Sequence, residues 1–391
     1  MTALTVCVPA YDVGSVVDET LASLQAQSFT DFRVEIAVEP PGTDTLAAVA
    51  PFLSDPRIEL HVNARRLGWA GNVRAQLQRV DTPYFVILPH DDWLDPEYLR
   101  LLMSTIEARP SASVAYGDMI VFGAAPPFRK LLDLPDGSVR QQLMAFFLGG
   151  AEAVPWRGVT RSSRIASTGG FPVDDHQGFA VECEWALSLL LQGPAVHVPQ
   201  AIYHKRIHAP DVVSASRARR RDVDAAGLVA GYEAHRSRML ALLAGGAEND
   251  PLLVLAAEAA MSRRFIKSLG QPFTPAALQR AQDALSTLAG SRTNEAAAIR
   301  SVIQLAMAHH FRLSKDRSSA EALTTEAVRS NPINVEALIY LARLRLKQDR
   351  SDEALALARE AGRLEPQFSG LQSLTAAAER TAADALKCPA L

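Results

Sequence analysis

The feature that most constrains the fold is a regular alternation, within the first hundred residues, of short apolar runs and segments with helical spacing. Four runs rich in β-branched and aromatic residues have the length of strands: 4–8, 34–38, 58–62 and 84–88. After the first run, Val17, Leu21 and Leu24 recur at the spacing of one helix face. This order predicts an α/β fold with a mostly parallel sheet covered by helices on both faces. Such sheets bind ligands at the carboxyl ends of their strands, so the residues that follow each run are the candidates for ligand binding and catalysis.

The second half of the chain has a different composition. Beyond Arg217 it is rich in Ala, Leu, Arg and Glu, with few candidate strands, which predicts an all-helical region. Near the C-terminus, two similar segments end at Pro332 and Pro366, 34 residues apart, which is the period of tetratricopeptide helix pairs. The glutamates that open them, Glu321 and Glu353, are only 32 residues apart, so one copy is irregular and a plain helical bundle is the alternative.

These patterns predict three parts: an α/β domain over 1–215, a helical linker or bundle over 216–315, and a tetratricopeptide-like segment over 316–391. A chain of 391 residues is long enough for two or three domains. A basic run at 216–222 lies at the first boundary. We interpret it as a solvated linker or helix face rather than as a contact with phosphate or lipid headgroups.

Charge and cysteine content exclude some classes of partner and site. With 43 acidic and 40 basic residues, the chain has no large cationic field to recommend nucleic acid as a partner. Three scattered cysteines without a CxxC pair argue against a disulfide framework or a structural zinc site. The N-terminus is typical of a strand rather than a signal peptide, and no uncharged stretch approaches the ~20 residues that span a bilayer. We therefore expect a cytoplasmic protein, which would reach a membrane-bound acceptor from the inner face.

Two adjacent carboxylates, Asp91 and Asp92, follow directly after the fourth apolar run. Paired carboxylates at a strand end repel each other unless a cation lies between them and an anionic ligand. They could instead only cap the following turn, but Asp95 and Pro96 already provide the start signal of the next helix. We therefore favour a site for a divalent cation, Mn²⁺ or Mg²⁺, that links a carboxylate to a diphosphate.

Seven short motifs occur in the order and spacing typical of one family. They are VCVPAYD at 6–12, IAVEPPGTD at 36–44, NARRLGWAGN at 63–72, ILPHDDWLDPEYL at 87–99, GGFPVDD at 169–175, VECEWALSLLLQG at 181–193 and IYHKRIH at 202–208. Over about 1–215 the chain thus resembles the family 2 glycosyltransferases of the GT-A fold. The resemblance implies an inverting transfer of a sugar from a nucleoside diphosphate sugar, of uridine or thymidine type, to an acceptor hydroxyl.

The resemblance also implies which residues would bind the donor. Asp91 matches the metal-binding aspartate of the DxD motif, whose first aspartate is replaced here by Pro89, and Asp92 and His208 are further candidate metal ligands. Arg206 would neutralise charge on the leaving diphosphate. The other candidates for nucleotide binding are Pro9, Ala10, Tyr11, Glu39, Asn63, Gly68, Asn72 and His90. Tyr11 would offer a ring face to the base, and Glu39 occupies the position of a family aspartate that contacts the nucleoside.

In this family the catalytic base is a carboxylate that opens the helix after the GGF turn. Here the matching segment holds Glu182 and Glu184, and Glu182 is the first choice. General base catalysis needs a group within hydrogen-bond reach of the acceptor hydroxyl. Two residues that are two apart on a helix point in different directions, so only one of the pair can serve.

The acceptor is the least readable partner. We expect it to be a glycan, a lipid-linked molecule or a polypeptide, bound near residues 124–159, with Trp156 and Trp185 as candidate sugar-stacking residues or, equally, core residues. The helical region could recognise a polypeptide acceptor, form a homodimer, bind another protein or only support the first domain.

Two other functions compete with sugar transfer. A nucleotidyltransferase is disfavoured, because such enzymes usually have a glycine-rich loop that ends near a lysine after the first strand. The segment VCVPAYDVGS at 6–15, which covers the end of that strand and the following loop, has neither the paired glycines nor the lysine. A catalytically degenerate scaffold that acts through its helical domain stays open, since Glu39, Pro89 and Cys183 depart from the family pattern.

Overall fold

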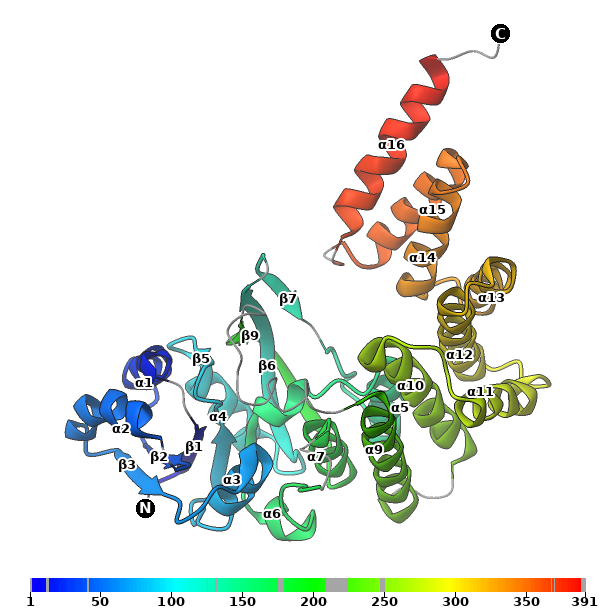
Figure 1. Ribbon diagram of the computed structural model, residues 1–391. Coiled ribbons are helices and arrows are strands. Elements are labelled where there is room, and N and C mark those ends of the chain that lie inside the picture. The colour runs from blue at the N-terminus through cyan, green and yellow to red at the C-terminus, as the bar shows by residue number, and fades with distance from the viewer. Residues whose placement is uncertain are drawn as a thin grey trace. The chain divides into compact units, whose positions relative to one another are not determined.

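The computed structural model (Figure 1) describes residues 2–11, 14–40, 42–124, 126–130, 132–174, 179–208, 224–246, 250–366, 368 and 370–387. Two compact units are present: the first comprises residues 1–146 and 151–249, and the second comprises residues 147–150 and 250–391. The predicted boundary at 215 and the basic run at 216–222 lie outside the described residues. The three-part division of the chain therefore stays a prediction.

The first unit is built on one nine-stranded sheet with the order β3-β2-β1-β4-β8-β6-β9-β5, and β7 pairs with β6. The strands are β1 Leu4–Ala10, β2 Phe32–Val38, β3 Ile58–Val62, β4 Tyr84–Ile87, β5 Trp93–Leu94, β6 Val114–Gly123, β7 Phe128–Lys130, β8 Val159–Arg161 and β9 Ala195–Ile207. The first four pair in parallel, as do β6 and β9, while β5, β7 and β8 pair antiparallel to their neighbours. The predicted mostly parallel α/β fold is confirmed.

The four apolar runs of the sequence correspond to the four parallel strands β1 to β4, as predicted. The first strand continues through Pro9 to Ala10, because Pro9 and Ala10 extend the register on β2 opposite Ala37 and Val38. All seven residues of β1 are buried. A strand buried on both faces reads as a continuous apolar run, which explains why this signal was clear in the sequence.

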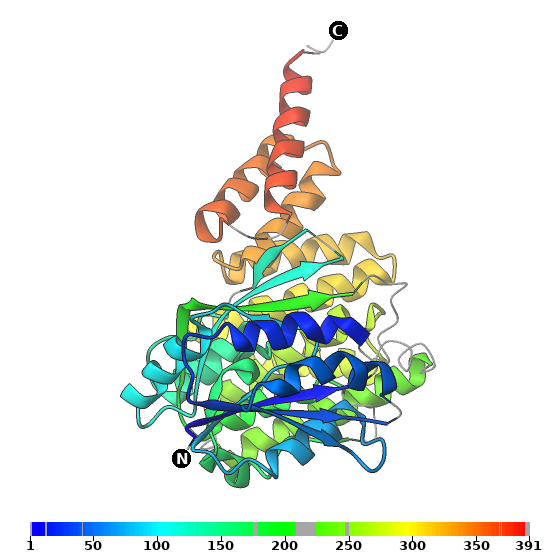
Figure 2. The same cartoon turned by 90° about the vertical axis from the view of Figure 1, so that its left-hand side faces the viewer.

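The helices of the first unit connect these strands. They are α1 Val17–Gln25, α2 Thr43–Val49, α3 Gly68–Leu77, α4 Tyr98–Ala108, α5 Val139–Leu148, α6 Ser163–Ser167, α7 Val181–Leu191 and α9 Ala225–Gly246, with the short 3-10 helices η1 Gly14–Val16, η2 Ala50–Ser54 and η3 Val154–Arg157. Figure 2 faces α1 and α2, which pack on each other near the N-terminal strands. α4 begins at Tyr98 without a side-chain cap, because the Asp95 carboxylate instead lies 2.8 Å from Nε2 of His204.

A bulge in the β6–β9 pairing changes the register of the second half of β9. The register shifts between Gly117 and Asp118, and a Cβ on Gly117 would lie 1.9 Å from the carbonyl oxygen of Ala201. Only glycine permits this close approach of two backbones. Since Arg206 lies near the end of β9 and His208 directly follows the strand, the bulge helps to decide where those side chains lie.

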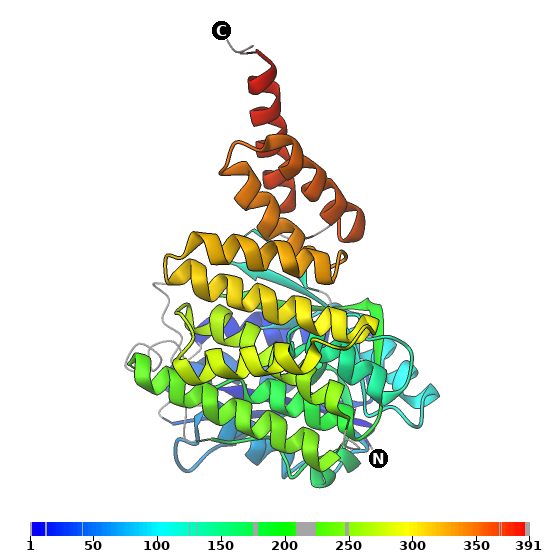
Figure 3. The same ribbon diagram turned by 90° about the vertical axis from the view of Figure 1, so that its right-hand side faces the viewer.

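The second unit is all-helical, as predicted for the C-terminal half. Its helices are α10 Pro251–Leu269, α11 Pro275–Leu288, α12 Asn294–Leu313, α13 Arg317–Ser330, α14 Val335–Leu346, α15 Ser351–Leu364 and α16 Leu371–Lys387. Asp250, Thr274, Thr293, Asp316 and Asn334 cap five of them by accepting hydrogen bonds from backbone N–H groups of the first turn. α12 and α13 lie side by side in Figure 3.

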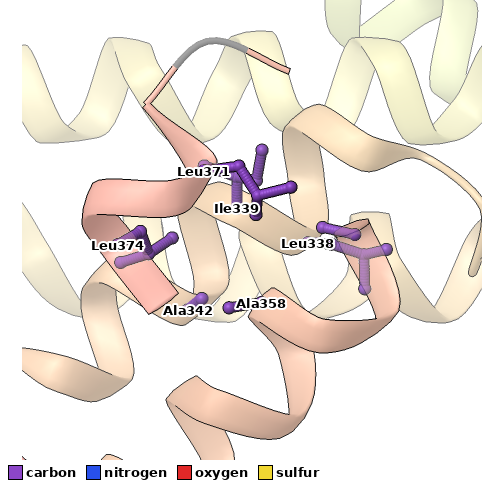
Figure 4. Packing of buried hydrophobic residues seen from close by; sticks show 7 residues of the cluster. Leu338, Ile339, Ala342, Ala358, Leu371 and Leu374 are labelled. Carbon is purple, nitrogen blue, oxygen red and sulfur yellow. The ribbon is translucent and has the colours of Figure 1, made fainter. Parts of the chain in front are cut away.

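The last three helices share a core of leucine, isoleucine and alanine. Figure 4 shows Leu371 and Leu374 of α16 against Ile339 and Ala342 of α14 and Ala358 of α15. Alanine at the crossing points lets the helices approach closely, and the larger side chains fill the space beside them. The two repeated segments of the sequence correspond to α13 and α15, and a tetratricopeptide-like character of this region stays a prediction.

Candidate active site

The ends of β1 and β4 meet at one edge of the sheet, as expected for neighbouring parallel strands. The chain leaves β4 through Leu88, whose N–H donates to the Cys7 carbonyl. His90 Nδ1 then lies 2.8 Å from the carbonyl oxygen of Pro9. The hydroxyl of Thr20, on α1, donates to the backbone carbonyls of His90 and Asp92, each at 2.8 Å. These contacts hold the turn that carries the two aspartates against β1 and α1.

Asp91 lies beside the predicted closing segment of the domain. His208 Nε2 is 2.8 Å from Asp91 Oδ2, and Arg206 Nε donates to the Asp91 carbonyl at 3.2 Å. Burial works to raise the pKa of Asp91, but the hydrogen bond with His208 and the nearby charges of both histidines lower it to about 2. Asp91 is therefore an anion at neutral pH and is placed together with Arg206 and His208.

Asp92 has a different environment from its neighbour. Its carboxylate accepts hydrogen bonds from the Tyr203 hydroxyl at 2.6 Å and from the Arg206 backbone N–H at 2.8 Å, and Arg157 Nε lies 3.7 Å away. Burial, together with the charge of Asp91, raises the pKa of Asp92 to about 6. Both oxygens are thus engaged in holding β9, so of the two aspartates Asp91 fits a metal better.

Among the described residues, no group of three or more His, Cys, Asp and Glu side chains is arranged to hold a metal ion. Asp91 and His208 form the pair available at this edge of the sheet. Mg²⁺ and comparable hard cations commonly take one or two protein ligands and complete their shell with substrate phosphate oxygens and water. The donor set therefore fits a cation that arrives with a diphosphate.

Three of the predicted nucleoside-binding residues, Glu39, Asn63 and Asn72, are linked to the end of β2 and the loop before α3 by hydrogen bonds. Glu39 Oε1 accepts the N–H of Leu67 at 2.6 Å, Asn63 Nδ2 donates to Asn72 Oδ1 at 2.9 Å, and Asn72 Nδ2 donates to the Ala37 carbonyl at 2.8 Å. These three side chains hold the loop before α3 against the end of β2. These hydrogen bonds engage polar atoms of all three side chains within the protein, so the residues act on a ligand through the loop that they hold.

The start of α3 holds the predicted Gly68 and lies next to Arg66, which was not among the predicted site residues. Gly68 opens the helix with a φ of 76°, a value that favours glycine. The Arg66 guanidinium lies 4.0 Å from the centre of the Tyr11 ring, so the ring face predicted for a base is stacked on a cation. The adjacent basic pair at 65–66 within the third motif was the available signal.

α7 presents its two glutamates to different surroundings. Glu182 is partly exposed. Burial works to lower the pKa of Arg157, but the charges of Tyr203, Asp92 and Glu182 raise it above its usual value. Glu184 is only 1% exposed. Its carboxylate is paired with His235 and Arg238 of α9. Glu182 is thus the glutamate on the side of Asp92.

Arg157 and Lys205 are charged residues of this site that the sequence did not single out. Lys205 lies two positions after Tyr203 on β9, so both side chains project from the same face of the strand. The charge of Arg157, and then burial, lowers the pKa of Lys205. Arg157 follows Trp156 on η3, and its guanidinium lies 5.3 Å from the centre of the Tyr203 ring. A charge inside a matched motif, as in KRIH, was the only signal for Lys205.

The two predicted sugar-stacking tryptophans lie in different positions. Trp185 is fully buried and packs on Phe85 and Phe171 at ring distances of 6.4 and 5.6 Å, which places it in the core. Trp156 is also largely buried and meets the half-buried Trp69 edge to face at 6.2 Å. The stretch predicted for the acceptor, 124–159, contains β7, α5 and η3, and two of its positions, 125 and 131, lie outside the described residues.

This α/β sheet has an acidic turn at the end of β4 with a histidine beside it. Comparison with known proteins gives a family match that includes this turn. Residues 5–159 match the family model described as glycosyl transferase family 2. An uncharacterized Mycobacterium tuberculosis protein is 26% identical over 235 residues, which cover 56% of this chain and 72% of that protein. An uncharacterized Sinorhizobium fredii protein is 29% identical over 122 residues, which cover 29% of this chain and 13% of that protein.

Among solved structures, Staphylococcus aureus TarS residues 1–349 in complex with UDP-GlcNAc superposes with a TM-score of 0.57 at 14% identity, covering 84% of this chain and 91% of that one. At this identity the likeness establishes the fold. Residues 5–159 are thus similar to glycosyl transferase family 2, and a helical C-terminal region follows further along the chain. No helix within the described ranges has both the length and the apolar character needed to cross a membrane.

Proposed function

We propose that this chain is an inverting glycosyltransferase that moves a sugar from a nucleoside diphosphate sugar to an acceptor hydroxyl with the help of a divalent cation. The observation that carries the proposal is the meeting of Asp91, which lies within the family match, with Arg206 and His208 at the end of β4. A uridine nucleotide is the first donor to test, because TarS of similar fold was solved with UDP-GlcNAc; a thymidine nucleotide is the second.

In this proposal Asp91 and His208 hold the cation, with Mn²⁺ or Mg²⁺ as the ions to test. When bound, the cation supplies positive charge beside the diphosphate. Arg206 adds a further positive charge near the same group, since its Nε already contacts the Asp91 carbonyl. Charge fixed in place before reaction stabilises the negative charge that develops on the leaving diphosphate without reorganisation of the site.

Glu182 is the proposed base. It takes the proton from the acceptor hydroxyl while that oxygen forms a bond to the anomeric carbon from the side opposite the diphosphate. The bond from the anomeric carbon to the diphosphate oxygen breaks with its electron pair leaving on that oxygen, so a single displacement inverts the configuration. Glu182 suits this role because it is partly exposed and its charge acts on both Arg157 and Lys205, which places it near these two cations.

Thermal-shift measurements on the full chain with UDP, TDP and GDP, each with and without Mn²⁺, test the proposal. We expect one nucleotide to stabilise the protein in a metal-dependent way, and we expect Asp91→Ala to abolish that dependence. Asp55→Ala serves as the control, because Asp55 pairs locally with Arg57. If no nucleotide stabilises the wild-type protein, the scaffold function, exerted through the helical region, replaces the proposal.

A further inference from the structure

The first turn of α7 carries a second carboxylate whose environment differs sharply from that of the proposed base. Glu184 Oε1 lies 2.7 Å from His235 Nδ1. Its carboxylate also accepts hydrogen bonds from Arg238 Nε at 2.8 Å and from the NH2 group of the same guanidinium at 2.9 Å. A base must meet the acceptor hydroxyl and release its proton after each turnover, and a carboxylate saturated inside the core cannot do so.

Arg238 also binds a third part of the chain. The NH2 group that reaches Glu184 lies 2.8 Å from Asp174 Oδ2, and the Asp174 side chain is 3% exposed. Asp174 precedes α7 in the predicted GGF turn segment, so one guanidinium joins the segment before α7, the first turn of α7 and α9. A planar guanidinium is suited to this, since it presents several donors in a rigid arrangement.

The histidine and the two carboxylates of this network are buried, whereas 31% of the Arg238 side chain is exposed. His235 has no exposed surface, and its ring meets Phe179 edge to face at 5.9 Å. Charge-assisted hydrogen bonds in a dry environment are stronger and better defined in geometry than exposed ones. The back of the first turn of α7 is therefore held by fixed contacts, while Glu182, two residues earlier than Glu184, lies on the side of Asp92.

We infer that Glu184, His235 and Arg238 are positioning residues that fix the first turn of α7 and thereby aim Glu182 at the acceptor hydroxyl. The inference rests on the proposed function, because it assumes that Glu182 is the base. It also makes α9, which begins at Ala225 and so beyond the predicted boundary at 215, a part of the catalytic unit.

The test uses the full chain and the nucleoside diphosphate sugar that stabilises it most. In Glu184→Gln we expect the rate constant for donor hydrolysis or transfer to fall at least tenfold while the donor dissociation constant changes less than twofold. Hydrogen exchange at the amides of 181–185 should become faster. Arg238→Lys, which keeps a charge but cannot bridge both carboxylates, should show an intermediate loss and serves if Glu184→Gln does not fold.

The matched control is Glu336→Gln in the helical unit, where the carboxylate is likewise paired with two cations, Arg263 and Lys267. This control should lose thermal stability without a change in the rate constant. The inference is overturned if Glu184→Gln keeps the wild-type rate, or if it abolishes turnover with unchanged exchange at 181–185, since Glu184 would then act on the substrate itself. A wild-type protein that binds no nucleotide contradicts the proposed function instead, and the exchange measurement still decides whether Glu184 holds α7.

Discussion

Asp91 and Asp92 are neighbours in sequence, but their carboxylates have different partners and different burial. Asp91 meets His208 near the strand edge, whereas Asp92 is buried under β9 and accepts hydrogen bonds from Tyr203 and Arg206. A buried carboxylate that loses a donor pays a desolvation cost that no water can offset. The stability of the site should therefore depend on the donors of Asp92, and its metal binding on Asp91.

Tyr203→Phe tests the first half of this statement. We expect a loss of ~1–3 kcal/mol in the free energy of unfolding, because Asp92 is left with one hydrogen-bond donor fewer. Tyr340→Phe is the matched control, since among the described residues the buried Tyr340 hydroxyl has no hydrogen-bond partner. Its removal should cost little. Urea unfolding of both variants checks the pair, and equal losses would contradict the role given to Tyr203.

His309, in the helical unit, gives a prediction for pH. Burial, with the nearby charge of Arg312, lowers the pKa of His309 from 6.5 to about 4. The folded state therefore takes up this proton at lower pH than the unfolded state does, so stability falls as the pH drops from about 6.5 towards 4. The charge of Glu336 raises the pKa of His309, and the charge of Lys267 lowers it, as that of Arg312 does.

His309→Gln should remove this contribution. We expect the variant to lose less stability than the wild type between pH 6.5 and pH 4.5, with a difference on the order of 2 kcal/mol. Chemical unfolding at a series of pH values, followed for both proteins, measures it. Parallel stability curves for the two proteins would show that His309 does not titrate as described.

At the scale of elements, the site depends on how strand β9 is bent. The bulge opposite Gly117 shifts the register before Tyr203, Lys205 and Arg206 are reached. Because side chains alternate across a strand, a slip of one residue would exchange the faces of Lys205 and Arg206. The bulge is thus a precondition for placing Tyr203 on Asp92 and Arg206 on Asp91.

Gly117→Ala should damage this element. The added Cβ would lie 1.9 Å from the Ala201 carbonyl oxygen, which is backbone and can yield only if the strands separate. We expect a loss of ~2 kcal/mol or more and weaker nucleotide binding. Gly245→Ala in α9 is the control: nothing lies within 4 Å of its added Cβ, so it should be neutral or stabilise the helix by ~0.5–1 kcal/mol. Thermal unfolding and nucleotide titration of both variants measure the contrast.

At the scale of the whole molecule, the chain contains two cores with different construction. The first lies around a sheet whose central strands are buried on both faces, and the second consists of helices packed through leucine and alanine. Each core buries its own apolar surface, which is the main favourable term in folding. A substitution that destabilises one core should therefore first loosen the unit that contains that core.

Leu338→Ala tests this in the cluster shown in Figure 4. The cavity should cost ~2–5 kcal/mol in the stability of the helical unit. The proposed nucleotide binding, which we assign to the first unit, should persist at temperatures where the helical unit of the variant has already loosened. Hydrogen exchange resolved by segment distinguishes the units, and a uniform loss of protection over residues 4–88 would contradict the prediction.

The elements at the start of the chain, the helical second half and the candidate residues at the strand ends were predictable from sequence. The parallel strands β1 to β4, the helical second half and the candidate residues Asp91, Arg206 and His208 were all readable, because periodicity and local motifs are properties of neighbouring residues. Periodicity also predicted helices for the two repeated segments, which are α13 and α15. It could not show how those helices pack, since that depends on which side chains meet.

Only the tertiary structure decided which of two similar residues faces the site. Glu182 and Glu184, and likewise Asp91 and Asp92, are indistinguishable by local chemistry. Glu184 is enclosed by His235 and Arg238, about fifty residues away in sequence, and Asp92 by Tyr203, more than a hundred residues away. Trp185 lies in the core for the same reason. The burial and charge state of a side chain are set by atoms from distant segments, and these become neighbours only when the chain folds.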